Sequence, residues 1–203
     1  RKSSNTVQND PNIRSLLEAE TTIITLFGKT WSLHVTDALG ISLVKNLELI
    51  SDSVAHLRSK GRRVFYDAEH FFDAYKANKE YSTRCLFAAE EAGAKAIVLC
   101  DTNGGTIPSE ITKIIKDVRP QIKTRLGIHC HNDADLAVAN SLLAVEGGAD
   151  MVQGTINGYG ERCGNADLIS IIANLKIKMG IDCISDEKLK DITRVSHFVS
   201  EIS

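Results

Sequence analysis

The sequence has no dense cluster of Lys and Arg and no long apolar run, and we expect no signal peptide. Its 24 basic residues are spread among 26 acidic ones, for a formal net charge of -2, so no nucleic-acid-binding surface is indicated. No apolar run approaches the roughly 18 residues that cross a bilayer. We therefore expect a cytoplasmic protein with neither a nucleic-acid partner nor a membrane partner.

A disulfide framework is also missing. The cysteines are odd in number, form no CxxC pair and lie mostly within apolar runs, at Cys85, Cys100, Cys130, Cys163 and Cys183. This pattern is typical of reduced, buried thiols in the cytosol. The chain has no initiator Met and opens on RKSSNTVQND, which predicts that it is part of a longer protein.

Strand-like and helix-like segments alternate along the 203 residues. Runs rich in Ile, Val, Leu and Phe predict five buried strands. These are TTIITLF, RVFYDAE, KAIVLCD, RLGIHCH and DMVQGTI. Apolar spacing predicts helices over 41–61, 78–93 and 108–120, after a first helix that Asp10 caps and Pro11 begins.

Such alternation fits a doubly wound open sheet or a (β/α)8 barrel. No GxGxxG or GxxxxGK[ST] follows a strand, which disfavours the nucleotide-binding sheet. Polar residues instead gather where each predicted strand ends, the edge at which barrels carry their active sites. Because a whole barrel takes about 250 residues, we expect one domain over 1–203 that forms a partial (β/α)8 TIM barrel lacking its N-terminal strands. The five strands should lie parallel and adjacent in chain order.

Two histidines flank a cysteine in GIHCHND, residues 127–133. Side chains alternate along a strand, so His129 and His131 share a face and Cys130 points away from it. Two imidazoles at the end of a barrel strand can chelate a divalent cation. The alternative is that neighbouring backbone groups or carboxylates satisfy the two imidazoles, which is the commoner case for an isolated HxH.

A glycine-rich segment follows over 153–168, QGTINGYGERCGNADL. Its glycines indicate a backbone that approaches another group closely or takes positive φ. Glu161, Arg162 and Asn165 add charge and an amide oxygen within reach. The alternative is an ordinary long turn.

The stretch GIHCHNDADLAVANSLLAVEGGADMVQGTINGYGERCGNADL closely resembles the HxHND, AVANS and GTINGxGERxGN signature of one family. This family contains the acyl-CoA Claisen-condensing synthases, which are pyruvate carboxyltransferase-like TIM barrels of the DRE-TIM metallolyase type. Its members make isopropylmalate, homocitrate and citramalate. VFYDAEHFFDAYKAN and IVLCDTNGGTIP are most similar to the citramalate synthase branch.

The resemblance implies an acyltransferase that condenses acetyl-CoA with a 2-oxo acid. Pyruvate giving (R)-citramalate, in isoleucine and branched-chain amino acid biosynthesis, fits best. Isopropylmalate or homocitrate synthesis is the nearest alternative, and a lyase running the reverse reaction fits the GERCGN stretch less well. An alternative of another class is a catalytically incomplete metal-binding fragment.

The resemblance also implies a metal site. His129 and His131 match the family's metal-binding histidines, and Asn165 matches the asparagine of its GERxGN loop, with Mg²⁺, Mn²⁺ or Zn²⁺ as the ion. The family's barrel begins with an earlier strand that carries an Asp-Arg-Glu-type motif. No such strand precedes these segments, so we expect the isolated chain to lack one metal ligand and an arginine, and to be inactive alone.

Two further positions match residues that act on the substrates, and a third is a candidate specificity position. Thr102, in CDTNGG, matches the threonine that holds the 2-oxo acid carboxylate. Glu69, in YDAEHFF, matches the glutamate implicated in removing a proton from the acetyl methyl group, although a strand-end salt bridge is the alternative. Asp67 shares its face and lies where the family varies with substrate. Since Glu69, Thr102 and His129 end different strands, they should converge on one cavity.

The remaining signals indicate structural roles. His34, His56 and His197 have no partner pattern, and Trp31 is expected to pack rather than line a pocket. Apolar positions over 185–203 predict an amphipathic helix that closes the barrel or contacts another subunit, and the resemblance implies a homodimer.

Overall fold

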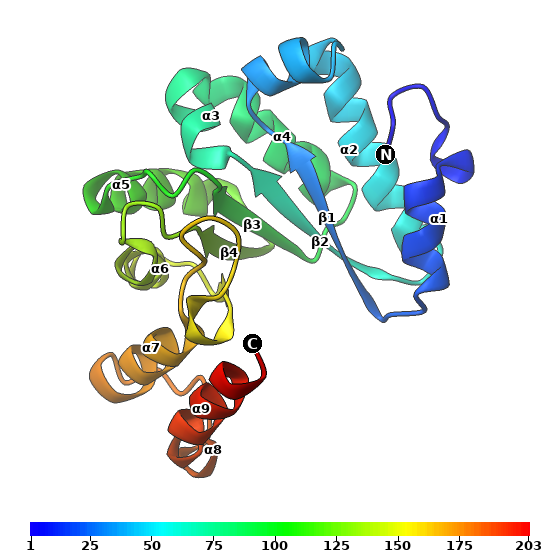
Figure 1. The fold of residues 1–203 in the computed structure, drawn as a ribbon. Coiled ribbons are helices and arrows are strands. Elements are labelled where there is room, and N and C mark those ends of the chain that lie inside the picture. Colours follow the sequence, from blue (N-terminus) through cyan, green and yellow to red (C-terminus); the bar gives the residue numbers. More distant parts are fainter. The chain divides into compact units, whose positions relative to one another are not determined.

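The computed structural model describes residues 1–203, and the chain divides into two compact units. Unit 1 comprises Arg1–Cys100 and Asp117–Gly127, and unit 2 comprises Asp101–Lys116 and Ile128–Ser203. Strands and helices alternate through both units (Figure 1). None of the helices combines the length and the apolar character that a membrane span requires. The predicted single domain over 1–203 stays a prediction.

The strands form one sheet in the order β1-β2-β3-β4-β5. They are β1 (Ile23–Lys29), β2 (Arg63–Glu69), β3 (Ala96–Asp101), β4 (Arg125–Cys130) and β5 (Met151–Gln153). β1 pairs with β2 and β2 with β3 in parallel, and Lys29 lies opposite Glu69. The predicted α/β fold, the five strands and their order are therefore confirmed, although β5 is shorter than its predicted segment.

Unit 1 carries four helices and three short helical turns. These are η1 (Val7–Asn9), α1 (Pro11–Glu18), η2 (His34–Ala38), α2 (Leu43–Ser59), α3 (Phe71–Ala77), α4 (Lys79–Glu91) and η3 (Arg119–Gln121). α2 and α4 lie side by side and pack against β2 (Figure 1). Ser42 and Asn78 begin these two helices by accepting backbone hydrogen bonds. Gly61 and Gly93 follow their ends at positive φ, and the predicted helices over 41–61 and 78–93 are confirmed.

The helices of unit 2 follow its strands. α5 (Pro108–Val118) begins in unit 2 and ends in unit 1. The others are α6 (Ala137–Glu146), η4 (Ile156–Gly158), α7 (Leu168–Ala173), η5 (Asn174–Lys178), α8 (Asp186–Lys190) and α9 (Ile192–Ile202). The predicted helix over 108–120 is confirmed, whereas α3 and α7, with 7 and 6 residues, are too short for apolar periodicity to reveal.

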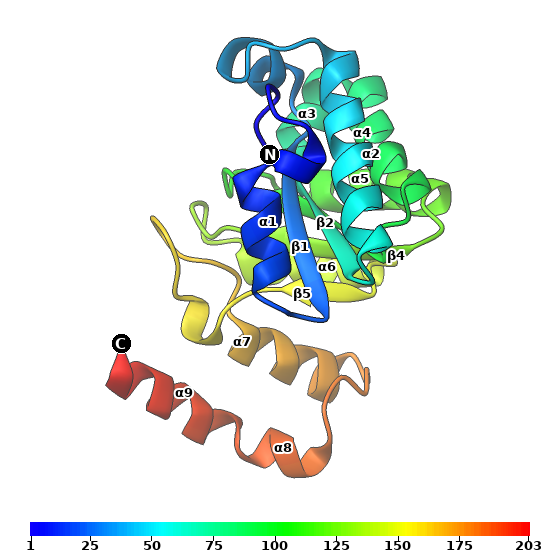
Figure 2. The same cartoon turned by 90° about the vertical axis from the view of Figure 1, so that its right-hand side faces the viewer.

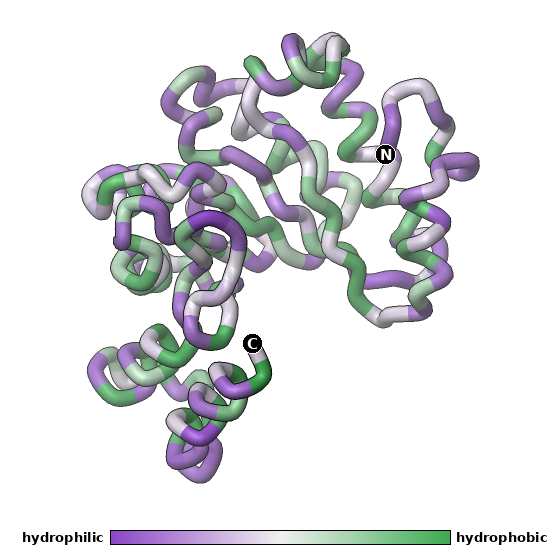
Figure 3. Tube along the Cα trace, in the orientation of Figure 1, coloured by the Kyte–Doolittle hydropathy of each residue, from purple (hydrophilic) through white to green (hydrophobic).

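The C-terminal segment differs from its prediction. Instead of one helix over 185–203, α8 and α9 meet at Asp191, whose backbone lies outside both helices. α9 runs beside α7 within unit 2 (Figure 2). Hydrophobic and hydrophilic residues alternate along it (Figure 3), yet Val195, Phe198 and Ile202 are exposed. The amphipathic pattern is thus present, but α9 buries no residue in this chain.

The cysteines within helices and strands are buried, and those in loops are exposed. Cys85, Cys100 and Cys130 are buried in α4, β3 and β4, as predicted. Cys163 and Cys183 are exposed, and for these two the prediction of burial was wrong. Both lie in loops, where the backbone needs water or specific partners and leaves side chains at the surface.

The cap of α1 is a buried carboxylate. Asp10 is 0% exposed, and its Oδ1 accepts hydrogen bonds from the backbone nitrogens of Asn12 and Ile13 at 3.1 and 3.2 Å. Its Oδ2 accepts from Lys2 N and Asn5 Nδ2, each at 3.0 Å. Burial alone raises the pKa of Asp10, but these hydrogen bonds outweigh it and hold the pKa below its ordinary value.

We expect Asp10→Asn to lower the free energy of unfolding by about 1–2 kcal/mol at neutral pH, because asparagine still accepts the cap hydrogen bonds but loses the charge that strengthens them. Because the pKa of Asp10 is lower in the folded state, its carboxylate stabilises the fold fully above the unfolded-state pKa of about 3.9. This stabilisation is lost as pH falls through the folded-state pKa. The difference between wild type and variant, measured by urea unfolding, should therefore shrink below about pH 4. A difference that is constant from pH 7 to 3 would contradict the role of the charge.

Candidate functional site

His129 and His131 lie together in unit 2. His129 belongs to β4 and His131 follows its end, and their ring centroids are 5.1 Å apart. The Nδ1 atom of His129 lies 3.0 Å from Gln153 Oε1 at the end of β5. An amide oxygen there selects the tautomer that is protonated on Nδ1, so Nε2 carries the free lone pair.

His131 meets Asn165 of the glycine-rich segment through an isolated β-bridge. Two of their side-chain atoms, His131 Nδ1 and Asn165 Oδ1, are buried without a hydrogen-bond partner. Burial, followed by the neighbouring His129 and the Arg162 cation, lowers the pKa of His131 below its ordinary value. The imidazole is therefore neutral near pH 7, the form that acts as a metal ligand.

The glycine-rich segment is a tightly packed loop. A Cβ atom on Gly160 would lie 2.0 Å from Asn165 Nδ2, and one on Gly164, which has a φ of +92°, would lie 2.2 Å from Gly158 O. Asn165 Nδ2 donates to Tyr159 O at 3.2 Å, which leaves its Oδ1 as the available atom. The glycines thus allow the backbone to close around Asn165.

Arg162 ties this loop to its neighbours. Its Nε and Nη2 donate to Asp133 Oδ1 and Oδ2 at 2.8 and 2.9 Å. Nη2 also donates to the carbonyl of Thr102, just beyond β3, at 2.8 Å. The Asp133 pKa falls chiefly through these hydrogen bonds from Arg162. Unit 2 therefore brings the Thr102 loop, the HxH segment and the Asn165 loop together.

Glu69 and Asp67 belong to unit 1. Burial alternates along β2, so these two side chains share the less buried face. Glu69 Oε2 lies 2.7 Å from Lys29 Nζ, and Thr30 Oγ1 donates to the Glu69 carbonyl at 2.6 Å. The strand-end salt bridge considered from the sequence is thus present.

The rings of Trp31, His34 and His70 form a cluster near Glu69, and no pattern in the sequence predicts these ring contacts. The ring of His34 lies 4.5 Å from that of His70 and 4.8 Å from that of Trp31. His70 has a φ of 57°, an uncommon conformation for a residue with a Cβ atom. Gln153 and Asp133 are likewise partners that the sequence did not indicate, because a hydrogen bond between distant segments leaves no local pattern.

The donor atoms of unit 2 fit a divalent cation. No group of three or more His, Cys, Asp and Glu side chains could hold a metal ion, and the set consists of two imidazoles and one amide oxygen. A buried polar atom without a partner costs about 1–3 kcal/mol, a penalty that a cation between His129, His131 and Asn165 would relieve. Such a set leaves positions open for substrate and water, unlike a closed structural site.

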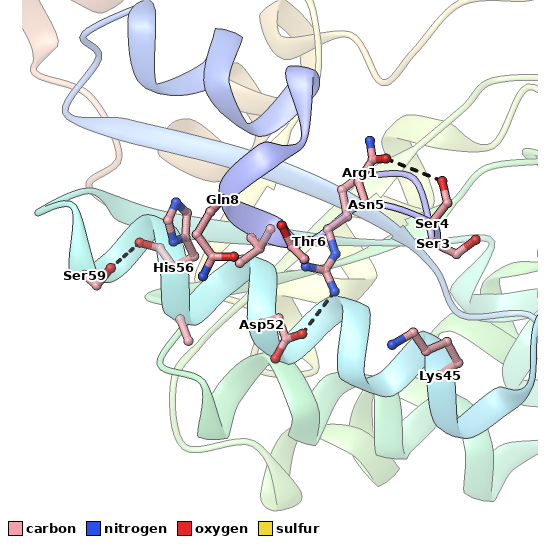
Figure 4. A pocket seen from close by; sticks show the side chains of 12 residues that line it. Arg1, Ser3, Ser4, Asn5, Thr6, Gln8, Lys45, Asp52, His56 and Ser59 are labelled. Atoms are coloured by element: carbon pink, nitrogen blue, oxygen red, sulfur yellow. Dashed lines mark hydrogen bonds and ion pairs between the residues drawn. The ribbon is translucent and has the colours of Figure 1, made fainter.

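A cavity of about 680 Å³ lies elsewhere, against the N-terminal segment and α2 of unit 1 (Figure 4). Arg1 donates to Asp52 across it at 3.0 Å. None of the residues predicted from the sequence as metal, substrate or catalytic groups lines this cavity. Its size alone therefore does not make it the reaction site.

Comparison with known proteins identifies one family and curated relatives that align with the whole chain. The model of the family described as HMGL-like matches residues 6–199. The chain is 55% identical over its whole length to the (R)-citramalate synthase of Geobacter sulfurreducens. It is 52% identical, also over its whole length, to that of Synechocystis sp.. The chain spans 38% of the length of each of these two curated relatives.

A solved structure supports the fold. The HMG-CoA lyase of Bacillus subtilis superposes with a TM-score of 0.80 at 19% identity, over 95% of this chain and 67% of that one. At this identity, the likeness concerns the fold alone.

Proposed function

We propose that this chain, which belongs to the HMGL-like family, carries catalytic residues of an acyltransferase that condenses acetyl-CoA with pyruvate to (R)-citramalate. The identity of 52–55% to relatives named (R)-citramalate synthase supports this choice of substrates. The observation that carries the proposal is the pair of buried, unpartnered atoms, His131 Nδ1 and Asn165 Oδ1, beside His129.

His129, His131 and Asn165 would hold one divalent cation, with Mg²⁺, Mn²⁺ and Zn²⁺ as the candidates. When bound, the cation supplies Lewis-acid polarisation of the 2-oxo carbonyl. Gln153 holds the His129 ring through Nδ1, and the packed glycine loop holds Asn165. These contacts behind the proposed ligands fix the directions of the His129 nitrogen and the Asn165 amide oxygen.

Glu69 and Thr102 would act on the two substrates. The Thr102 hydroxyl binds the carboxylate of the 2-oxo acid, and the Glu69 carboxylate takes a proton from the acetyl methyl group. The methyl carbon then forms a bond to the 2-oxo carbon as the C=O π bond breaks, and the resulting alkoxide oxygen takes up a proton. Water then cleaves the thioester, which gives the carboxylate of the product and free CoA. Lys29 and Thr30 orient Glu69 through its carboxylate and its carbonyl. Asp67, on the same face of β2, is proposed to select among 2-oxo acids.

The test is thioester-dependent release of free CoA by the full-length protein with Mn²⁺ present. We expect the highest kcat/KM with pyruvate, compared with 2-oxoisovalerate and 2-oxoglutarate, because discrimination is set by the ratio of these values. Preference for 2-oxoisovalerate would assign isopropylmalate synthesis, and preference for 2-oxoglutarate would assign homocitrate synthesis. Metal binding without CoA release from any of the three would instead indicate a non-catalytic metal-binding protein.

We also propose a setting for this activity. The relatives' name, (R)-citramalate synthase, supports a role in isoleucine and branched-chain amino acid biosynthesis, and the five free cysteines support a reducing cytoplasm. The exposed apolar residues Val195, Phe198 and Ile202 of α9 support association of two copies as a homodimer.

A further inference from the structure

Three loops of unit 2, which follow β3, β4 and β5, are joined by backbone hydrogen bonds. His131 N donates to Asp101 O at 3.2 Å, and Ala134 N donates to Gly104 O at 3.1 Å. Asn132 N donates to Gly164 O at 2.9 Å. The loop after β4 is therefore attached to both of its neighbours through the main chain.

One side chain, that of Arg162, contacts all three loops. It extends from the glycine-rich loop, binds both carboxylate oxygens of Asp133 and reaches the carbonyl of Thr102. Its Nη1 also donates to Glu161 at 2.9 Å. Only a planar guanidinium offers donors in this fork, whereas a lysine ammonium acts as a single point.

The backbone at Arg162 is in an unfavourable conformation. Its φ of 55° lies in the left-handed region, which is costly for a residue with a Cβ atom. A single exposed ion pair contributes too little to hold such a conformation, but a bidentate pair with a further hydrogen bond is stronger. Strained residues of this kind cluster at functional sites, where the surrounding contacts determine them.

We propose that Arg162 is a positioning residue that fixes the metal-binding loop relative to the loop that holds the 2-oxo acid carboxylate. Arg162 stands three residues before Asn165, Asp133 stands two residues after His131, and the bonded carbonyl belongs to Thr102 itself. The inference rests on the proposed function, in which these residues bind metal and substrate. Because its donors already have protein partners, Arg162 acts through these residues rather than on the substrate.

The test uses Arg162→Lys in the full-length protein, because lysine keeps the charge and loses the fork. Mn²⁺ alone is titrated by calorimetry, and the KM values for pyruvate and acetyl-CoA are measured at saturating Mn²⁺. We expect the Mn²⁺ dissociation constant to rise about 10-fold or more, the usual loss when a contact behind a metal ligand is removed. The KM for pyruvate should rise while that for acetyl-CoA stays within about twofold, because Arg162 contacts only the carboxylate and metal loops.

Asp133→Asn provides a second variant with the same expectation, and it carries the test if Arg162→Lys fails to fold. The double variant should be no worse than the more affected single one, because both changes break the same contact. Arg194→Gln is the matched control, since Arg194 forms an exposed pair with Asp191 at 3.1 Å in the same unit. We expect it to match wild type.

Unchanged Mn²⁺ affinity in both single variants, with wild type binding Mn²⁺ and releasing CoA, would overturn the inference and leave the proposed function standing. Equal rises in the two KM values would also overturn it, since they indicate a general loss of structure. A wild-type protein that neither binds Mn²⁺ nor releases CoA would overturn the proposed function, and the inference with it.

Discussion

Glu69→Gln in the full-length protein is expected to lower kcat by about 10²-fold or more while the Mn²⁺ affinity stays at its wild-type value. The amide has the shape of the carboxylate but cannot accept a proton, and general base catalysis commonly contributes about 10²–10⁴-fold. The metal donors His129, His131 and Asn165 are untouched by this change. The measurements are the rate of CoA release at saturating substrates and a calorimetric Mn²⁺ titration.

The matched control is Glu48→Gln. Glu48 pairs with Lys45 at 3.0 Å, as Glu69 pairs with Lys29, but it lies on the exposed face of α2. We expect this variant to keep wild-type turnover, so that any large effect at Glu69 reflects more than the loss of an ion pair. Near-normal kcat in Glu69→Gln would remove Glu69 from the mechanism.

The double variant His129→Ala, His131→Ala is expected to lose the bound divalent metal. In the full-length protein it removes two of the three donors proposed in this chain, and the Asn165 amide oxygen with the one ligand expected from the earlier strand does not retain a cation through gel filtration. Metal content after gel filtration should fall from near stoichiometric to background. CoA release should fall with it, because polarisation of the 2-oxo carbonyl is lost.

His197→Ala serves as the control for this experiment. His197 lies in α9 of the same unit, outside the proposed donor set, and its removal should leave metal content unchanged. Circular dichroism of the double variant should match wild type, since neither imidazole contributes to the apolar core. Wild-type metal content in the folded double variant would refute the site.

Local patterns in the sequence were sufficient to predict most of the strands and helices of the fold. Apolar runs placed β2 at its observed bounds, and helical spacing with Asp10 and Pro11 placed α1. These features depend on neighbours within a few residues, because burial on one face imposes the period of the element. The same reasoning put His129 and His131 on one face, and their rings lie 5.1 Å apart.

Only the tertiary structure decided the contacts that hold the candidate site. Arg162 and Asp133 are 29 residues apart and Arg162 and Thr102 are 60 apart, and nothing local to any of them indicates the partner. Three other features also had no local signal in the sequence. They are the break between α8 and α9, the exposure of Cys163 and the contact of the Trp31 and His34 rings. The physical reason is that periodicity records which side of an element is buried, whereas the meeting of side chains from separate loops depends on how the strand ends are packed.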